Sequence, residues 1–337
     1  MSYKIKTNDF NSYLKKWSED YEIYAPVRIK AAGRFSDTDN IRYEKINKVE
    51  EMEHKEKSTF SAKKVLFPVT ETMFNIEKEK LSEPTYEEKK YLVFLRSCDI
   101  HAIDRMDKMF LENGNYEDPY YKRRRDNIKF ILMGCSESFD NCFCVSMSSN
   151  KTENYSMGVK FLSDEIYIEV KDPIFKDDFK NEEEIEFTPD YVRKNNYEVE
   201  LPNIEKLNLS LFKDEMWEDY EKRCVACGRC NYSCPTCTCF TTTDIYYSEN
   251  PDNGERRRVW AGCQVDKFTD MAGGHTFRKD HGSRMRFKTM HKVYDFKKRF
   301  DQTMCVGCGR CDDRCPEYIS FARCINLVAE KVNKEEK

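Results

Sequence analysis

The chain has 337 residues, of which 35% are charged and 39% hydrophobic, enough for two ordinary domains with modest apolar cores. Its formal charge of −4 argues against a nucleic-acid-binding protein, because such proteins usually carry a clear basic excess. The sequence has no run of the ~18 apolar residues that a membrane span needs and no secretion signal at its start, so we expect a cytoplasmic protein with no membrane contact. In a reducing cytosol its sixteen cysteines are expected to hold metal, with disulfides as the alternative.

Residues 1–171 are predicted to form an α/β domain. Three short apolar runs are typical of strands buried on both faces of a largely parallel sheet: 65–69, 91–95 and 128–133. Apolar residues at helical spacing predict a helix over 99–111, with Asp99 as its N-cap, so the last two strands and this helix make a β-α-β unit. Residues 157–170 are predicted to form a hairpin.

The second half of the chain is predicted to be a separate domain. Residues 172–206 are charged and lack apolar periodicity, which indicates an inter-domain segment; surface helices and loops of a single domain are the alternative. Residues 207–337 are expected to form a largely α-helical, ferredoxin-like domain that binds two [4Fe–4S] clusters, with an insertion at 240–300.

A four-cysteine motif followed by proline, C-x2-C-x2-C-x3-C-P, occurs twice in this domain. The first three cysteines of such a motif wrap one cubane cluster, and the fourth binds the other cluster in two-cluster ferredoxins. The spacing therefore predicts one cluster on Cys224, Cys227, Cys230 and Cys315, and a second on Cys305, Cys308, Cys311 and Cys234. Gly228 and Gly309 supply the backbone freedom that such tight loops need.

Other metals fit this motif less well. Zinc sites usually pair two C-x2-4-C halves and have no use for a third cysteine at the same spacing. The C-x5-C and C-x3-C spacings of siroheme reductases occur here only as subsets of the longer motifs.

A third cluster is predicted in the first domain. Cys98 and Cys135 each follow a predicted parallel strand, at the sheet edge where α/β proteins bind ligands, and the loop after Cys135 brings Cys142 and Cys144 to the same place. The alternative is that these four cysteines are buried small hydrophobic residues or free thiols.

The remaining features are less specific. Cys237, Cys239 and Cys263, with His275, are candidates for an extra metal site, and packing near the clusters is the alternative; Cys324 is expected to be a core thiol. Residues 253–299 contain 13 Lys or Arg and 5 Asp or Glu, which either compensate the anionic clusters or form a docking face. Arg229 and Arg310, inside the two motifs, are candidates for tuning the clusters or docking a partner, with solvated surface charge as the alternative.

The sequence lacks motifs for substrate chemistry. It has no G-x-G-x-x-G after a strand, no P-loop and no H-E-x-x-H, so we expect neither NAD, flavin nor siroheme in this chain, and no catalytic residues. Partner proteins are expected to supply and accept the electrons.

Seven segments resemble the iron–sulfur electron-transfer subunit of anaerobic (dissimilatory) sulfite reductase, itself similar to the β subunits of sulfhydrogenases: GRFSDTDN (33–40), RSCDIHAIDRMD (96–107), CSESFDNCFCVSM (135–147), CGRCNYSCPTCTCF (227–240), NPDNGERRRVWAGC (250–263), DMAGGHTFR (270–278) and CVGCGRCDDRCP (305–316). The segments 33–40 and 135–147 look closer to the sulfite reductase family.

The resemblance implies a cytoplasmic complex of three subunits. A flavin subunit would oxidise NADH, this chain would relay the electrons, and a siroheme subunit would reduce sulfite to sulfide. Two alternatives stay open: the β subunit of a soluble nickel–iron hydrogenase or sulfhydrogenase, and, from another class, an iron–sulfur sensor or structural protein.

Overall fold

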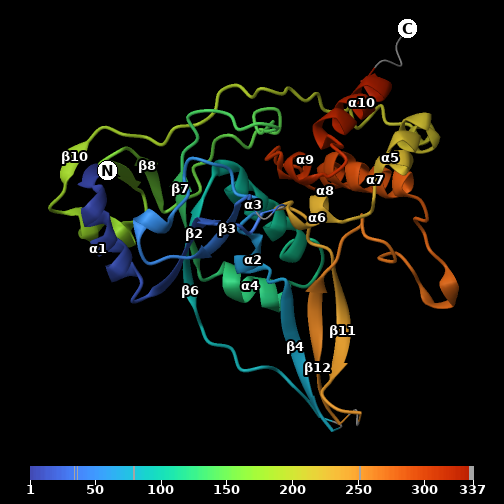
Figure 1. Ribbon diagram of the computed structural model, residues 1–337, viewed down its shortest axis with the longest axis horizontal. Helices are drawn as coiled ribbons and strands as arrows, with labels where there is room; N and C mark the ends of the chain where they lie inside the picture. The colour runs from blue at the N-terminus through green and yellow to red at the C-terminus, as the bar shows by residue number, and fades with distance from the viewer. Residues whose placement is uncertain (34, 36, 79, 250–251, 334–337) are drawn as a thin grey trace.

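The first part of the chain forms an eight-stranded mixed sheet (Figure 1). A computed structural model describes residues 1–33, 35, 37–78, 80–249 and 252–333, so Arg34 and Ser36 of the segment 33–40, and Asn250 and Pro251 of the segment 250–263, lie outside the described residues. The strand order is β10-β1-β9-β8-β7-β6-β2-β3, with parallel pairing along β2, β6, β7 and β8. The strands are β1 (Ser2–Lys6), β2 (Tyr21–Ile29), β3 (Asn40–Lys45), β6 (Lys90–Leu95), β7 (Ile128–Met133), β8 (Met157–Phe161), β9 (Glu165–Val170) and β10 (Glu183–Ile185).

Helices cover both faces of this sheet because its central strands are apolar on both sides. In β6, Leu92 and Phe94 pack on the face covered by α1 (Thr7–Trp17), while Val93 and Leu95 pack on the opposite face. That second face is covered by α2 (Lys63–Leu66), α3 (Ser97–Phe110) and α4 (Pro119–Arg125). Two 3-10 turns complete this part, η1 (Val49–Glu51) and η2 (Pro173–Phe179).

Several predicted elements are confirmed here, and two are wrong. The segments 91–95 and 128–133 form adjacent parallel strands, and residues 157–170 form the expected hairpin. The run 65–69 is not a strand: α2 ends at Leu66, and the buried side chains of Leu66 and Phe67 pack beneath the sheet. Asp99 is not the N-cap of α3, because the helix begins two residues earlier, at Ser97.

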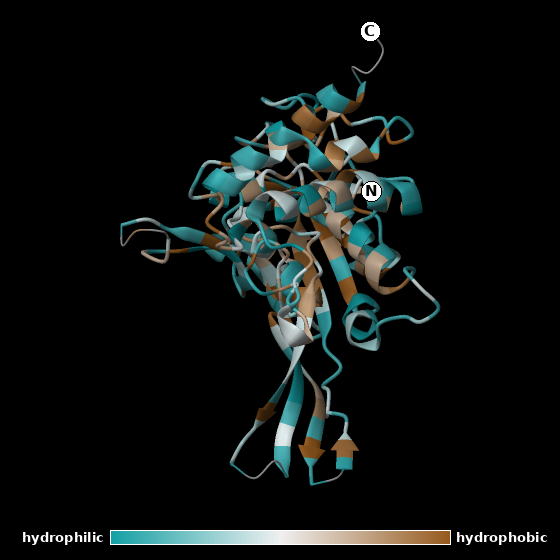
Figure 2. Ribbon diagram, turned by 90° about the vertical axis from the view of Figure 1, so that its right-hand side faces the viewer, coloured by the Kyte–Doolittle hydropathy of each residue, from teal (hydrophilic) through white to brown (hydrophobic). Residues whose placement is uncertain are grey.

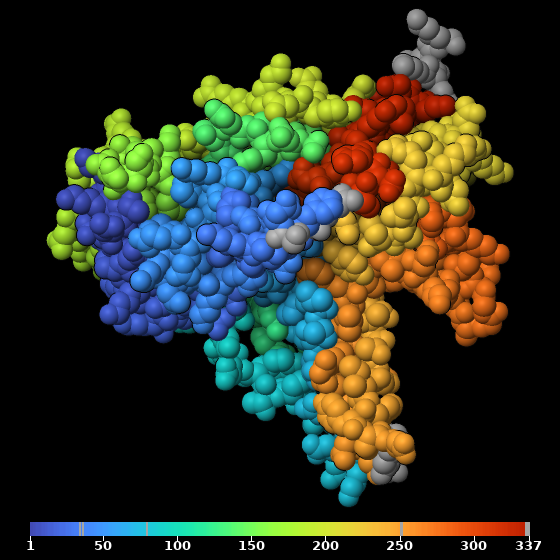
Figure 3. All heavy atoms as spheres, viewed as in Figure 1, coloured from blue at the N-terminus to red at the C-terminus, as the bar shows by residue number. Residues whose placement is uncertain are grey.

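A second, four-stranded sheet is built from both halves of the chain and projects from the body (Figures 1 and 3). Its order is β11-β12-β4-β5, all antiparallel, so that β4 from the first half pairs directly with β12 from the second. The strands are β4 (Thr70–Glu77), β5 (Lys80–Ser82), β11 (Phe240–Tyr246) and β12 (Asn253–Trp260). We call this sheet the β-arm.

The remainder of the second half consists of short helices and turns around its own apolar core. Buried Trp217, Met285, Ile325 and Val328 belong to that core, and Figure 2 shows hydrophobic residues on the inner sides of these helices. The helices and turns are η3 (Leu209–Lys213), η4 (Glu215–Trp217), α5 (Glu218–Arg223), α6 (Arg229–Tyr232), η5 (Ala272–Gly274), α7 (His281–Met290), the π-helical η6 (His291–Asp295), α8 (Phe296–Phe300), α9 (Arg310–Arg314) and α10 (Phe321–Asn333). No helix among the described residues has the length and apolar character needed to cross a bilayer.

Candidate iron–sulfur centres

The first predicted group of four cysteines lines a single hollow between α6, α7 and the chain after α9. Cys224, Cys227, Cys230 and Cys315 all border this hollow, together with Lys288 and with Cys311, which belongs to the second predicted group. The loop closes because Gly228 adopts a left-handed conformation (φ +69°) just before α6, where a Cβ would meet the side chains of Val265 and Tyr232. The structure therefore brings together the four cysteines that the motif spacing groups.

The second group is formed by the 305–311 loop and by Cys234, which comes from the other motif. Burial raises the pKa of Cys305 to about 11 and that of Cys308 to about 12, and the nearby Cys234 thiol adds to both shifts. Burial also raises the pKa of Cys311 well above its ordinary value, with Cys234 again close by. Cys234 thus lies among the neighbours of the second motif's first three cysteines, and Cys315 borders the hollow of the first motif.

The third group gathers at the carboxyl edge of the large sheet. Cys98 follows β6 and Cys135 follows β7, while Cys142 and Cys144 lie in the loop that continues from Cys135. Burial raises the pKa of Cys98 well above its ordinary value, that of Cys142 to a smaller extent, and that of Cys144 to about 11; the thiols within the group add to all three shifts.

Two buried side chains hold sulfurs of the third group in place. Arg96 is 6% exposed; its guanidinium lies 3.2 Å from the Cys135 sulfur and donates a 2.6 Å hydrogen bond to the carbonyl of His54. The Asn195 amide donates to the Cys144 sulfur at 3.5 Å and to Ser138 at 2.9 Å, while its oxygen accepts the backbone N–H of Val145 at 2.7 Å. Donors aimed at sulfur in this way are typical of iron–sulfur ligands.

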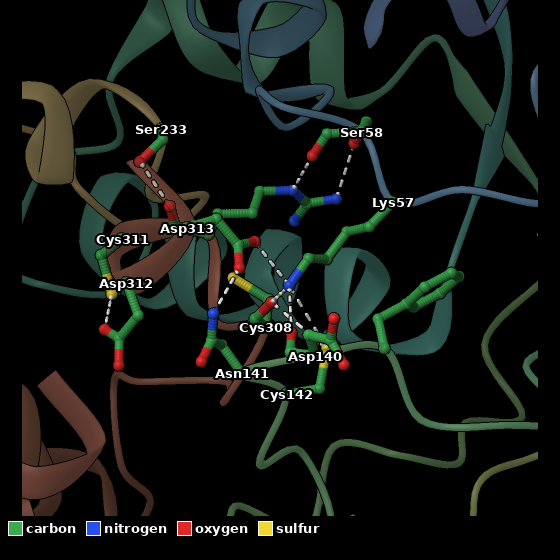
Figure 4. A network of polar contacts seen from close by, with 12 residues as sticks. Lys57, Ser58, Asp140, Asn141, Cys142, Ser233, Cys308, Cys311, Asp312 and Asp313 are labelled. Carbon is green, nitrogen blue, oxygen red and sulfur yellow. Dashed lines mark hydrogen bonds and ion pairs between the residues drawn. The ribbon is translucent and has the colours of Figure 1, made fainter. Parts of the chain in front are cut away.

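The second and third groups meet directly, as Figure 4 shows. The Cys142 sulfur lies 3.4 Å from the carbonyl oxygen of Cys308. The Lys57 ammonium sits at this junction, 3.7 Å from the Cys142 sulfur and 3.3 Å from the same carbonyl, and pairs with Asp313 at 2.6 Å. One cation therefore serves two cysteine groups from opposite halves of the chain.

Further lysines are buried against thiols in the second half. Lys288 and Lys292 are 3% and 2% exposed, and no ion pair joins either to a carboxylate within the described ranges. Burial opposes the charge on Lys288, but the neighbouring thiols, Cys230 foremost, raise its pKa well above the ordinary value. Two lysines of the basic 253–299 segment thus face the cysteine groups, in agreement with charge compensation.

This donor set fits [4Fe–4S] clusters. Thiols in groups of four, with buried ammonium groups and side-chain N–H donors facing the sulfur atoms, provide the ligands and the countercharge that an anionic cluster requires. Among the described residues, no three His, Cys, Asp or Glu side chains are arranged around the position of a single metal ion.

The two candidate arginines differ in their environment. Arg310 is 1% exposed and donates to both carboxylate oxygens of Asp99, at 2.6 and 2.9 Å, and to Ser58. A side chain so buried is neither a solvated surface charge nor part of a docking face, so only a role inside the protein remains for Arg310. Arg229 is partly exposed at the start of α6.

The four residues of the predicted extra site are not all brought together. Cys237, Cys239 and Cys263 lie near one another, beside Cys234. His275 instead lies on an exposed turn against the Phe277 ring, and no contact within the described part of the chain joins it to these cysteines. Cys324 is fully buried in α10, 3.3 Å from the Thr289 hydroxyl, which is the core position that its sequence context predicts.

Sequence reasoning missed Lys57, Asp99 and Asn195 as neighbours of the cysteine groups. Lys57 and Asn195 reach their cysteines from segments distant in sequence, and Asp99 pairs with Arg310 of the second motif; none of the three belongs to a spaced motif. The only available signal was that Asp99 directly follows Cys98.

Comparisons with known proteins agree with this geometry. Residues 223–319 match the 4Fe-4S dicluster domain family. The chain is also 29% identical to the sulfhydrogenase 2 subunit beta of Pyrococcus furiosus over 346 aligned positions, which cover 97% of this chain and 98% of that relative. No solved structure gives a significant match. The chain is therefore an iron–sulfur electron-transfer protein that carries [4Fe–4S] clusters.

Proposed function

We propose that this chain is the iron–sulfur subunit of a hydrogenase complex of the sulfhydrogenase type, in which it relays electrons between a nickel–iron protein and a second redox partner. The observation that carries the proposal is the similarity to a sulfhydrogenase beta chain over nearly the whole of both proteins, including the first half outside the dicluster domain. Electron relay also suits a chain whose sequence has no nucleotide or substrate motif.

We assign three sets of ligands to the clusters. They are Cys224, Cys227, Cys230 and Cys315; Cys305, Cys308, Cys311 and Cys234; and Cys98, Cys135, Cys142 and Cys144. When bound, such clusters accept and release one electron at a time.

The protein's own part is to fix the order of these sets. The contact between the Cys142 sulfur and the Cys308 carbonyl joins the third set to the second, and the two short helices α6 and α9 pack against each other where the second set adjoins the first. Cys227 is exposed and Val225 is 57% exposed, so the first set reaches the surface. We place one exchange point for electrons with a partner there.

A second candidate is the electron-transfer subunit of a sulfite reductase complex, whose partners would be a flavin protein that oxidises NADH and a siroheme protein that reduces sulfite. The segments 33–40 and 135–147 favour it, since they look closer to that family. The second segment contains three cysteines of the third set. Both candidates give this chain the same role in a cytoplasmic complex and differ only in the partner.

The test is anaerobic purification of the tagged chain from its native host with whatever it binds, followed by assays for nickel and for the siroheme absorption spectrum. Nickel in proportion to the chain, without siroheme, supports the hydrogenase complex; siroheme without nickel replaces it with the sulfite reductase complex. Clusters that stay oxidised when the reduced partner is added would contradict both and favour a sensor or structural protein.

The ligand sets are tested separately, on the chain alone. Replacing Cys98 and Cys135 with serine is expected to remove about four iron atoms and four acid-labile sulfides per chain, together with one electron spin resonance signal of the reduced protein. Cys324→Ser is the matched control, since Cys324 is a buried thiol outside every set. An iron content equal to that of the wild type in the double variant would refute the assignment of the third set, and the assignments of the other two sets would stand.

A further inference from the structure

Three cysteines outside the proposed sets meet at the base of the β-arm. Cys237 and Cys239 lie just before β11, and Cys263 lies just after β12. These strands are antiparallel partners, with Phe240 opposite Trp260, and the pairing continues as Ala261 donates to the Cys239 carbonyl at 3.0 Å. The register of the hairpin therefore carries Cys239 and Cys263 to the same end, where the chain entering β11 adds Cys237.

A buried asparagine connects two of these sulfurs. Asn231, 2% exposed, directs its amide nitrogen at the Cys237 sulfur (3.5 Å) and at the Cys263 sulfur (3.4 Å). Its oxygen accepts the backbone N–H of Gln264 at 3.0 Å, which fixes the orientation of the amide. The Asn231 amide nitrogen thus donates to two sulfur atoms. Such hydrogen bonds stabilise thiolates more than neutral thiols.

Two buried lysines lie beside the same sulfurs. Lys63, 5% exposed, donates to the Cys237 carbonyl at 2.8 Å and lies 3.9 Å from the centre of the Trp260 ring. Lys292 donates to the Thr236 hydroxyl at 2.8 Å. Within the described residues no carboxylate pairs with either ammonium group. Buried cations need an anionic neighbour, because their desolvation is otherwise costly.

We propose that Cys237, Cys239 and Cys263 bind a fourth iron–sulfur centre, a [4Fe–4S] cluster held by three protein thiolates. Binding releases the three thiol protons to solvent, and the resulting anionic cluster supplies the countercharge for Lys63 and Lys292. Three cysteines leave one of the four irons without a cysteine ligand. His275 does not supply the missing ligand, because it lies on an exposed turn elsewhere.

The location gives this centre a place in the electron path. The Cys237 thiol is within hydrogen-bonding reach of Cys234, a ligand of the second set, and the Cys263 thiol lies close to Cys230 of the first. The fourth centre thus adjoins both clusters of the dicluster domain and forms a branch on a line that otherwise runs from the third set to the first.

The first test measures iron, acid-labile sulfide and zinc in the full chain, purified anaerobically. The Cys239→Ser/Cys263→Ser variant is expected to contain about four iron atoms and four sulfides fewer than the wild-type protein and Cys324→Ser, whatever the total. Circular dichroism and retention of the remaining iron would show that this variant folds. Iron unaffected by the double replacement, or zinc lost in place of iron, would overturn the proposal.

A second test uses the iron that lacks a cysteine ligand. Ferricyanide takes one electron from a [4Fe–4S]2+ cluster, which then releases Fe2+ and leaves [3Fe–4S]+. A three-iron spin resonance signal is expected in the wild type and in Cys324→Ser, and its absence in Cys263→Ser. The same signal in Cys263→Ser would refute the assignment. Neither test depends on the identity of the partner or on the Cys98 and Cys135 replacements, so failure here is distinct from failure of the proposed function.

Discussion

The sulfur of Cys142 lies 3.4 Å from the carbonyl oxygen of Cys308, although 166 positions separate the two residues in the chain. Each residue belongs to a different proposed ligand set, so a cysteine sulfur of the third set touches the backbone of the loop that carries the second set. Electron transfer falls off steeply with distance through protein, and we therefore expect electrons to cross between the α/β part and the dicluster domain at this junction.

Replacing Lys57 with methionine is expected to lower the reduction potentials of the clusters on either side of this contact. The Lys57 ammonium lies 3.7 Å from the Cys142 sulfur and 3.3 Å from the Cys308 carbonyl, and its loss also leaves Asp313 without its cation. Both changes make the surroundings more negative, which disfavours adding an electron. A redox titration followed by spin resonance measures the shift.

Lys55→Met is the matched control for Lys57, because Lys55 is an exposed lysine two residues away. We expect the cluster reduction potentials of this variant to stay near those of the wild type, because solvent screens the charge of Lys55. Equal reduction potentials in the wild type, Lys57→Met and Lys55→Met would show that Lys57 does not tune the clusters.

Replacing Gly309 with alanine is expected to disrupt the junction. Gly309 has φ +70°, and a Cβ there would collide with the backbone carbonyl of Asn141, which cannot move without displacing Cys142. Backbone strain and the collision together should cost about 3 kcal/mol or more. The measurement is the midpoint of thermal unfolding together with the iron content per chain.

Gly273→Ala separates strain from collision. Gly273 also has a positive φ, +82°, but a Cβ there would meet no atom within 4 Å. A smaller loss of stability, with full iron content, is expected. Equal losses in the two variants would mean that the contact with Asn141 contributes nothing.

Replacing Arg310 with methionine is expected to destabilise the protein strongly. The change leaves the Asp99 carboxylate buried at 3% exposure without its partner, and removing one member of a buried pair typically costs about 3–5 kcal/mol. Denaturant unfolding followed by circular dichroism gives the free energy of unfolding. The double variant Arg310→Met/Asp99→Leu should recover part of the loss, and Arg229→Met, at a partly exposed site, should lose little. A double variant no more stable than the single one would argue against the pair.

Stability should decrease as the pH falls below about 6.5, in part because of His291. Burial, and then the neighbouring Lys292, lower the pKa of His291 to about 4. In the unfolded chain this histidine has an ordinary pKa of about 6.5, so the unfolded state binds the proton at a higher pH than the folded state. The free energy of unfolding therefore falls progressively between pH 6.5 and pH 4, and the contribution of His291 to this loss is about 2 kcal/mol at pH 5. His291→Gln should lose less stability than the wild type between pH 7 and pH 5. Identical pH dependence in the two proteins would contradict the assignment.

The short-range features of the cysteine sets were predictable from sequence, and the long-range ones were not. The spacing within each motif fixes which cysteines share a loop, and parallel strands placed Cys98 and Cys135 at one sheet edge. The run 65–69 was misassigned because a five-residue apolar segment has no periodicity to separate a strand from a buried helical turn. Pairing of β4 with β12 follows from tertiary packing across nearly two hundred residues, for which neither strand carries a local signal.

The contact of the 305–313 segment with residues 141–144 also has a consequence for thiol protection. Phe143 donates its backbone N–H to the Gly307 carbonyl at 2.8 Å, and the Asn141 amide donates to Asp313 at 2.9 Å, so a segment distant in sequence forms one wall around the third cysteine group. Cys142 and Cys144 are buried in the folded chain. A chain truncated before residue 305 is therefore expected to expose these thiols to solvent and to oxidise faster than the intact chain.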